Sequence, residues 1–164
     1  MKKIISLFLV SVLIFSLIAC GATDDSDQAD DSFFGRNTPS DILDTLLADE
    51  NTVTMVVEKL DLSNKELYQT HLFVPLTSAV KEAAIASPMI GTIPFFVGVL
   101  KTDSSKNAKA LANDIYDNVN YQKLICVSFN KAYTKAVGNT VILILDGDTQ
   151  RADRIASLVD SLAK

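Results

Sequence analysis

Two carboxylates separated by one glycine, Asp146 and Asp148, are the residues of this chain best placed to bind a cation. They follow the strongly apolar run Thr140–Leu145, and loops that lead from a strand into a helix often carry function. The same letters also have a structural interpretation, because Gly147 suits a turn and Asp148 suits the first position of a helix. The structural interpretation is favoured, and Asp146 and Asp148 stay the candidate cation ligands.

Residues for nucleophilic catalysis are scarce. His71 is the single histidine and lies near the end of an expected helix, where contact with the helix dipole is its ordinary role. Cys126 lies in an apolar run with no Lys, Arg or His beside it to activate the thiol, which favours a small buried side chain. The chain has no Gly-x-Ser-x-Gly, no phosphate-binding glycine motif and no zinc-ligand spacing. We therefore predict no catalytic residue, no cofactor and no enzymatic activity.

The first twenty residues differ from the rest of the chain. Lys2 and Lys3 precede the run Ile4–Ile18, which is apolar apart from three serines, and a small residue follows. This order is typical of a secretory signal peptide. Two alternatives compete with a lipid-anchoring signal: a true membrane span, for which about 17 apolar residues is the lower limit, and an ordinary cleaved signal in which Cys20 stands by chance.

The end of this run, Leu17–Cys20, resembles the lipobox of bacterial lipoproteins at all four positions. The resemblance implies cleavage between Ala19 and Cys20 and transfer of a diacylglyceryl group to the thiol of Cys20. Each buried methylene contributes about 0.8 kcal/mol, so two or three acyl chains would hold the protein on a membrane essentially permanently. We therefore expect residues 1–19 to be a signal peptide and the mature protein to lie on the extracytoplasmic face of the bacterial cell membrane.

The charge of the chain excludes one class of partner. It carries 20 acidic and 15 basic side chains, with a pI near 4.7, so it lacks the basic surface that nucleic acids require. Residues 20–37 hold five aspartates among small and polar residues and predict a flexible acidic tether behind the lipidated cysteine. Phe33 and Phe34 interrupt this tether, and they either dock on the folded domain or mark its true start.

Residues 38–164 predict a single α+β domain, an antiparallel sheet with helices packed mainly on one face. The first helix has a capping residue at Thr38, Pro39 at its first position and Asp41 at its third. Segment 52–60 fits a strand better than a helix, although both patterns are present. The later helices are expected to begin at Ser63 (ending near His71), at Asp103 or Ser104, and at Asp148. The remaining strands are expected at 80–87, 92–102, 123–129, 132–137 and 140–145.

An internal echo appears at an offset of 44 residues. Val97 and Val99 align with Val141 and Leu143, and the apolar positions of the two following helices align as well. Either a strand-strand-helix unit occurs twice, or any strand followed by an amphipathic helix aligns in this way. Both alternatives give the same α+β class.

Two of the expected strands are apolar on both faces. Runs Phe95–Leu100 and Val141–Leu145 lack the alternation of a sheet with one wet face. The second face must therefore be covered, either by the N-terminal helices or by a partner. The first alternative is favoured, because large exposed apolar patches are uncommon on monomers.

The order of these features resembles a known family. A lipobox, an acidic linker, a strand with an acid-rich turn and helix, and then the run Lys135–Leu143 before a closing amphipathic helix are similar to the Gram-positive lipoproteins catalogued as domain of unknown function 4358. The resemblance spans residues 39–163. It implies a lipid-anchored extracytoplasmic domain and supplies no catalytic residues.

The sequence thus predicts a membrane-anchored lipoprotein that binds another component of the cell envelope and is not an enzyme. The alternative is an accessory solute- or cation-binding lipoprotein that uses Asp146 and Asp148. Its partners would be the membrane, through the lipid at Cys20, and an envelope protein, with no nucleic acid.

Overall fold

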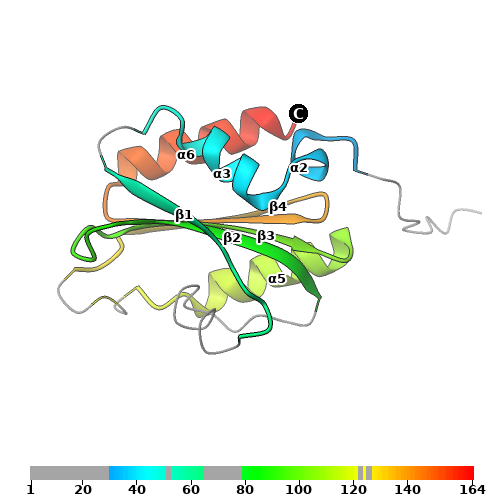
Figure 1. Cartoon of the computed structure of the whole chain (residues 1–164), viewed down its shortest axis with the longest axis horizontal. Coiled ribbons are helices and arrows are strands. Elements are labelled where there is room, and N and C mark those ends of the chain that lie inside the picture. The colour runs from blue at the N-terminus through cyan, green and yellow to red at the C-terminus, as the bar shows by residue number, and fades with distance from the viewer. Residues whose placement is uncertain (1–29, 51–52, 65–78, 122–123, 125–126) are drawn as a thin grey trace, which may run out of the picture.

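The computed structural model describes residues 30–50, 53–64, 79–121, 124 and 127–164 (Figure 1). In chain order the elements are α2 (Phe33–Arg36), α3 (Pro39–Leu47), β1 (Met55–Lys59), β2 (Val80–Pro88), β3 (Phe95–Thr102), α5 (Ser105–Asn118), β4 (Lys131–Val137), β5 (Thr140–Asp146) and α6 (Thr149–Leu162). The strands form one antiparallel sheet in the order β1-β2-β3-β5-β4. The predicted α+β class is confirmed.

Strands β3 and β5 form the middle of the sheet. Their register places Phe95 opposite Asp146 at one end and Lys101 opposite Thr140 at the other. The β4–β5 hairpin turns at Gly138, whose φ of 55° is a conformation that glycine adopts at little cost. This register defines two poles, one at the β2–β3 turn and Asp146, and one at the β4–β5 turn.

Successive side chains of the central strands enter two separate cores, one on each face of the sheet. Leu143 packs in a cluster with Leu111 of α5, whereas its neighbour Ile144 packs in a cluster with Ile42 of α3 and Ile155 of α6. The two-residue period of a strand produces this division. Figure 1 shows α5 on one side of the sheet and α3 and α6 on the other.

The chain itself therefore covers the second face of the sheet. Among the described residues, helices α2, α3 and α6 lie on one face and α5 lies on the other. The expectation of helices mainly on one face is met by three of the four helices that the structure describes. The N-terminal helix α3 contributes to covering the sheet, as favoured, but it shares its face with α6. A β5 strand buried at every position needs cover on both sides.

The internal echo has a limited structural meaning. The order strand-strand-helix does occur twice, as β2-β3-α5 and β4-β5-α6. However, Val97 lies on the face of α3 and α6, and Val141, which the offset aligns with it, lies on the face of α5. The echo thus reflects a shared alternation of apolar residues and not two superimposable copies.

One expected strand is wrong over the residues that the structure describes. In segment 123–129, Leu124 and Val127–Phe129 are not in a strand. The apolar residues of the segment serve the core instead, because Phe129 is 4% exposed and packs on the α5 side. The expected helix from Ser63 to His71 lies mostly outside the described residues.

The folded body begins before residue 38. Helix α2 is capped by Ser32, and Phe34 is fully buried. The hydroxyl of Thr140 donates to the Phe34 carbonyl at 3.3 Å, and Nζ of Lys101 donates to the Gly35 carbonyl at 2.8 Å. Residues 30–37, here called the docked segment, thus belong in large part to the domain although the sequence assigned them to the tether. Of the two alternatives for the Phe33–Phe34 pair, docking is observed.

The helix starts follow the predicted capping chemistry. Thr38 and Asp41 form a reciprocal capping box, and Ser104, not Asp103, caps α5. Helices α5 and α6 each have 14 residues, and no helix in the described part of the chain is long and apolar enough to cross a membrane.

Candidate functional site

The loop that follows β5 places Asp146 and Arg151 in a buried ion pair. Asp146, the last residue of β5, is fully buried, and Arg151, in the first turn of α6, is 7% exposed. Nε of Arg151 donates to Oδ2 of Asp146 at 2.7 Å, and Nη2 donates to Oδ1 at 2.6 Å. Two parallel charge-assisted bonds of this kind fix both side chains in one geometry. The carboxylate raises the pKa of Arg151 through the hydrogen bonds that it accepts.

Neighbouring residues close around this ion pair. The guanidinium of Arg151 lies 4.1 Å from the centre of the Phe95 ring, which adds a cation–π contact. The amide of Gly147 donates to the Pro94 carbonyl at 2.7 Å. A Cβ at Gly147 would lie 2.4 Å from Cγ of Pro94, so only glycine fits there without a shift. The side chain of Asn130 donates to the Gly147 carbonyl at 2.7 Å.

Asp148 caps helix α6. One of its carboxylate oxygens accepts from the amides of Gln150 at 2.9 Å and Arg151 at 3.2 Å. The bond from the Arg151 amide is the main cause that lowers the pKa of Asp148. The structural interpretation of this residue, a helix cap, is therefore observed.

The candidate cation ligands have these partners already. Both carboxylate oxygens of Asp146 are held by Arg151, and the Oδ1 atom also accepts from the Asp148 amide at 2.8 Å. A cation at Asp146 would have to displace a guanidinium from a buried position. Within the described residues no three His, Cys, Asp or Glu side chains gather in a way that could hold a metal ion. The arrangement connects β3, β5 and α6, and the cation-binding alternative gains no support from it.

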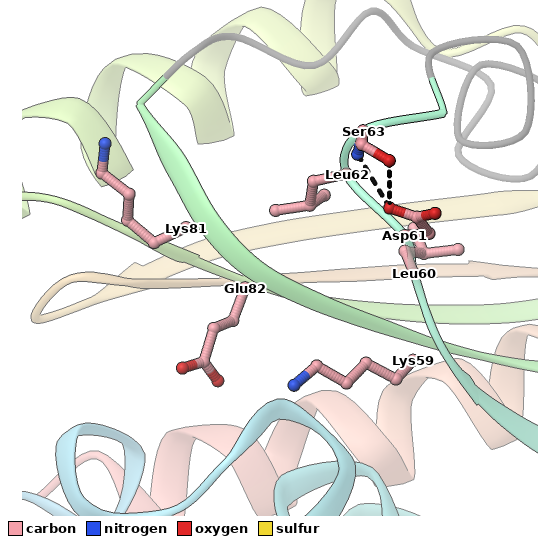
Figure 2. A pocket seen from close by; sticks show the side chains of 7 residues that line it. All are labelled: Lys59, Leu60, Asp61, Leu62, Ser63, Lys81 and Glu82. Atoms are coloured by element: carbon pink, nitrogen blue, oxygen red, sulfur yellow. Dashed lines mark hydrogen bonds between the residues drawn. The ribbon is translucent and has the colours of Figure 1, made fainter.

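A shallow hollow of about 460 Å³ opens at the end of β1 (Figure 2). Its lining residues are Lys59, Leu60, Asp61, Leu62, Ser63, Lys81 and Glu82. Oδ1 of Asp61 accepts from the amide of Ser63 at 3.0 Å and from its hydroxyl at 2.6 Å, and the hydroxyl bond is the main cause that lowers the pKa of Asp61. Nζ of Lys81 lies 3.9 Å from a carboxylate oxygen of Asp103. The hollow thus combines side chains of both charges with the apolar Leu60 and Leu62.

Strand β4 and helix α6 are connected by exposed polar pairs. The hydroxyl of Tyr133 donates to Asp160 at 3.0 Å, and the ammonium of Lys135 binds the same carboxylate oxygen. Burial of the ring raises the pKa of Tyr133, and the bond from Lys135 lowers the pKa of Asp160. Exposed pairs of this kind contribute little stability, and they occupy the polar groups of this edge of the sheet.

Four of the residues singled out in the sequence, Ala19, Cys20, His71 and Cys126, lie outside the described residues. The position of the first described residue, Asp30, is relevant to the proposed anchor. A Cβ on Gly138 would lie 1.7 Å from Oδ2 of Asp30, so the Asp30 carboxylate sits directly on the β4–β5 turn. Asp30, the first described residue, therefore lies at that pole.

The sequence did not lead us to Arg151, and it left two alternatives for Phe34, docking on the folded domain or marking its start. A signal for Arg151 was present, since a single arginine in the first turn of a helix follows an aspartate that ends a fully apolar strand. A charge in that position needs a partner, and a buried carboxylate is the obvious one.

Comparison with known protein families, curated proteins and solved structures finds no match to this chain.

Proposed function

We propose that this protein is a lipid-anchored module on the extracytoplasmic face of a bacterial membrane, which works by binding another component of the cell envelope. The observation that carries the proposal is the run Leu17–Cys20 at the end of an apolar segment that begins after two lysines. Its resemblance to a lipobox makes Cys20 the anchoring residue. The family resemblance stated above is part of the same proposal.

The docked segment supports this assignment. The chain toward the proposed anchor leaves a body to which it is fixed by the buried Phe34 and by the bond from Lys101 to the Gly35 carbonyl. Only residues 20–29 separate the anchor from this attachment, and a chain of that length spans about 36 Å at most. The domain is thereby held close to the surface in a restricted orientation, which suits a protein that contacts its neighbours.

The chemistry of the described loop supports binding over catalysis. Asp146, Arg151 and Asp148 are each occupied by structural bonds that join elements of the fold. Four exposed apolar side chains lie elsewhere, on β1 and in the turn beside it: Val56, Val57, Met89 and Ile90. Exposed apolar residues that lie close together are typical of a protein contact.

Intact mass spectrometry of the full chain, extracted from its native membrane, tests the anchor. We expect a polypeptide that begins at Cys20 and carries the added mass of its acyl chains. The Cys20→Ser variant should carry no lipid, and Cys126→Ser, which changes the other cysteine, should carry the same lipid as wild type. An intact Met1 on the mature protein, or an unmodified Cys20, would overturn the proposal.

A further inference from the structure

The outer edge of β1 gathers exposed apolar side chains beside an open row of backbone groups. Among the described residues, β1 is paired only with β2 and is the last strand on its side of the sheet. Val56 is 46% exposed and Val57 is 36% exposed at its centre. In the β2–β3 turn next to it, Met89 is 70% exposed and Ile90 is 61% exposed. Figure 1 shows β1 at the front of the sheet, with α3 on one side of it.

The other edge of the sheet is built differently. Strand β4 carries Lys131 and Lys135, whose ammonium groups bind Asp153 and Asp160 of α6. Lysines on an edge strand oppose pairing with another chain. The centre of β1, Val56 and Val57, carries no charge, and its two charged residues, Glu58 and Lys59, stand at its C-terminal end. The two edges therefore differ in a way that marks β1 as the one available for pairing.

The hydrogen bonds to β2 show which groups of β1 are open. The amide of Leu60 donates to the Ala83 carbonyl at 2.9 Å, and the amide of Met89 donates to the Thr54 carbonyl at 3.3 Å. Because the direction of these groups alternates along an antiparallel strand, the even-numbered residues of β1 face β2. The amides and carbonyls of Met55, Val57 and Lys59 consequently point away from the sheet.

We propose that this edge pairs with the same edge of a second copy of the chain, antiparallel and with Val57 on the twofold axis. In this register all three outward residues pair, Val57 with Val57 and Met55 with Lys59 of the second copy, which gives six backbone hydrogen bonds. Glu58 lies opposite Val56 of the second copy, so no like charges face each other. A register whose twofold axis lies one residue closer to the C-terminal end would form only four backbone hydrogen bonds. It would also place Glu58 opposite Glu58 of the second copy, and like charges directly opposite each other are unfavourable.

The same register brings the exposed turn into the contact. Thr54 then lies opposite Leu60 of the second copy, and Met89 is bonded to Thr54 on its other side. The apolar β2–β3 turn of one copy is therefore adjacent to the strand end where Leu60 and Leu62 of the second copy line the hollow of Figure 2. One interface would thus include both the exposed β2–β3 turn and the apolar residues that line the hollow.

The pairing is compatible with two copies on one membrane, a point that rests on the proposed function. A twofold axis perpendicular to the sheet leaves each face on its own side, as antiparallel edge pairing requires. The docked segment lies on the face of α3 and α6, so both copies present it on the same side. With the sheet parallel to the membrane, both tethers of residues 20–29 start from that side and reach the surface within about 36 Å.

Oxidative cross-linking of the full chain in native membranes tests the register. Val57→Cys should form a disulfide-linked dimer, because the two Cα atoms would lie about 5.5 Å apart. Tyr116→Cys, at a side chain on α5 that is 59% exposed, is the matched control and should give no more dimer than wild type, which carries the same native cysteines. Equal cross-linking of the two variants overturns the proposal, as does a product in which Val57→Cys is joined to a different protein.

Sedimentation of the full chain in detergent tests the backbone bonds. Val57→Pro removes an outward amide that no β2 residue uses, so it should weaken dimerisation at least tenfold, an order-of-magnitude expectation from two lost bonds. Val57→Lys keeps the amide and places like charges on the axis, so it should weaken dimerisation too. A monomeric wild-type chain, or a dimer unaffected by both variants, overturns the proposal. A wild-type chain that dimerises although its Cys20 carries no lipid would refute the anchor alone, and a lipidated monomer would refute the pairing alone.

Discussion

Replacement of Arg151 by methionine should be the most damaging single change in the described loop. The substitution keeps most of the side-chain volume and removes the guanidinium that binds both oxygens of the fully buried Asp146. A buried charge without its partner costs about 3–5 kcal/mol of unfolding free energy. For a domain of this size that corresponds to a fall in melting temperature of roughly 10–20 °C.

A matched control and a double variant separate the ion pair from a general effect of the substitution. Arg154→Met makes the same change one turn further along α6, at an arginine whose side chain is 57% exposed and whose partner Glu50 is 9% exposed. It should lower the melting temperature clearly less than Arg151→Met, because one side of this pair is open to solvent. Asp146→Asn with Arg151→Met removes the unpaired charge and keeps an acceptor for the Asp148 amide. The double variant should recover at least half of the loss.

Thermal and urea unfolding of the four chains provides the measurement. The reasoning fails if Arg151→Met is no more damaging than Arg154→Met, or if the double variant is as unstable as Arg151→Met alone. Either result would mean that Asp146 is solvated or finds another partner when Arg151 is absent.

Two further changes test other parts of the fold. Phe34→Ala should lower the unfolding free energy, measured by urea titration, by about 3–5 kcal/mol, because the ring is fully buried. Phe33→Ala, at a partly exposed ring, should cost clearly less in the same titration. Equal losses would mean that the docked segment is not held by Phe34. Stability should fall in acid, because hydrogen bonds hold the pKa values of Asp41, Asp148 and Asp160 below the ordinary range of an aspartate. Their contribution is present above about pH 4 and is lost as the pH falls through the lowered values. Asp148→Asn, which caps without titrating, should flatten this decline in melting temperature, and an unchanged pH profile would contradict the assignment.

The elements that could be predicted are those whose causes lie within a few residues. Thr38, Pro39 and Asp41 predict a helix start because the capping bonds are local. The run Thr140–Leu145 predicts a strand buried on both faces because apolar residues occupy every position. Segment 123–129 has similar letters and is wrong as a strand over its described part, because its apolar side chains pack into the core from outside the sheet, with Phe129 on the α5 side.

The functional interpretation divides in the same way. The apolar N-terminal run, its lipobox-like end Leu17–Cys20 and the acidic composition are properties of the sequence alone, and the first two carry the proposed anchor. The candidate pair Asp146 and Asp148 was identified by spacing, but spacing does not show that Arg151 occupies one carboxylate and two backbone amides the other. The sequence did not predict the open edge of β1 either, because the order of strands in a sheet depends on all the strands together and not on the residues of one strand.

By itself, the sequence determined where helices begin, which strands are buried on both faces and where the chemistry of an anchor could lie. Only the tertiary structure decided that α5 and α6 take opposite faces, that Phe34 is buried beside a strand more than 100 residues away, and that β1 is an edge. The physical reason is the separation along the chain of the residues that interact. Caps and alternation follow from bonds between near neighbours, whereas the choice of face, docking site and edge depends on which distant surfaces exclude water together.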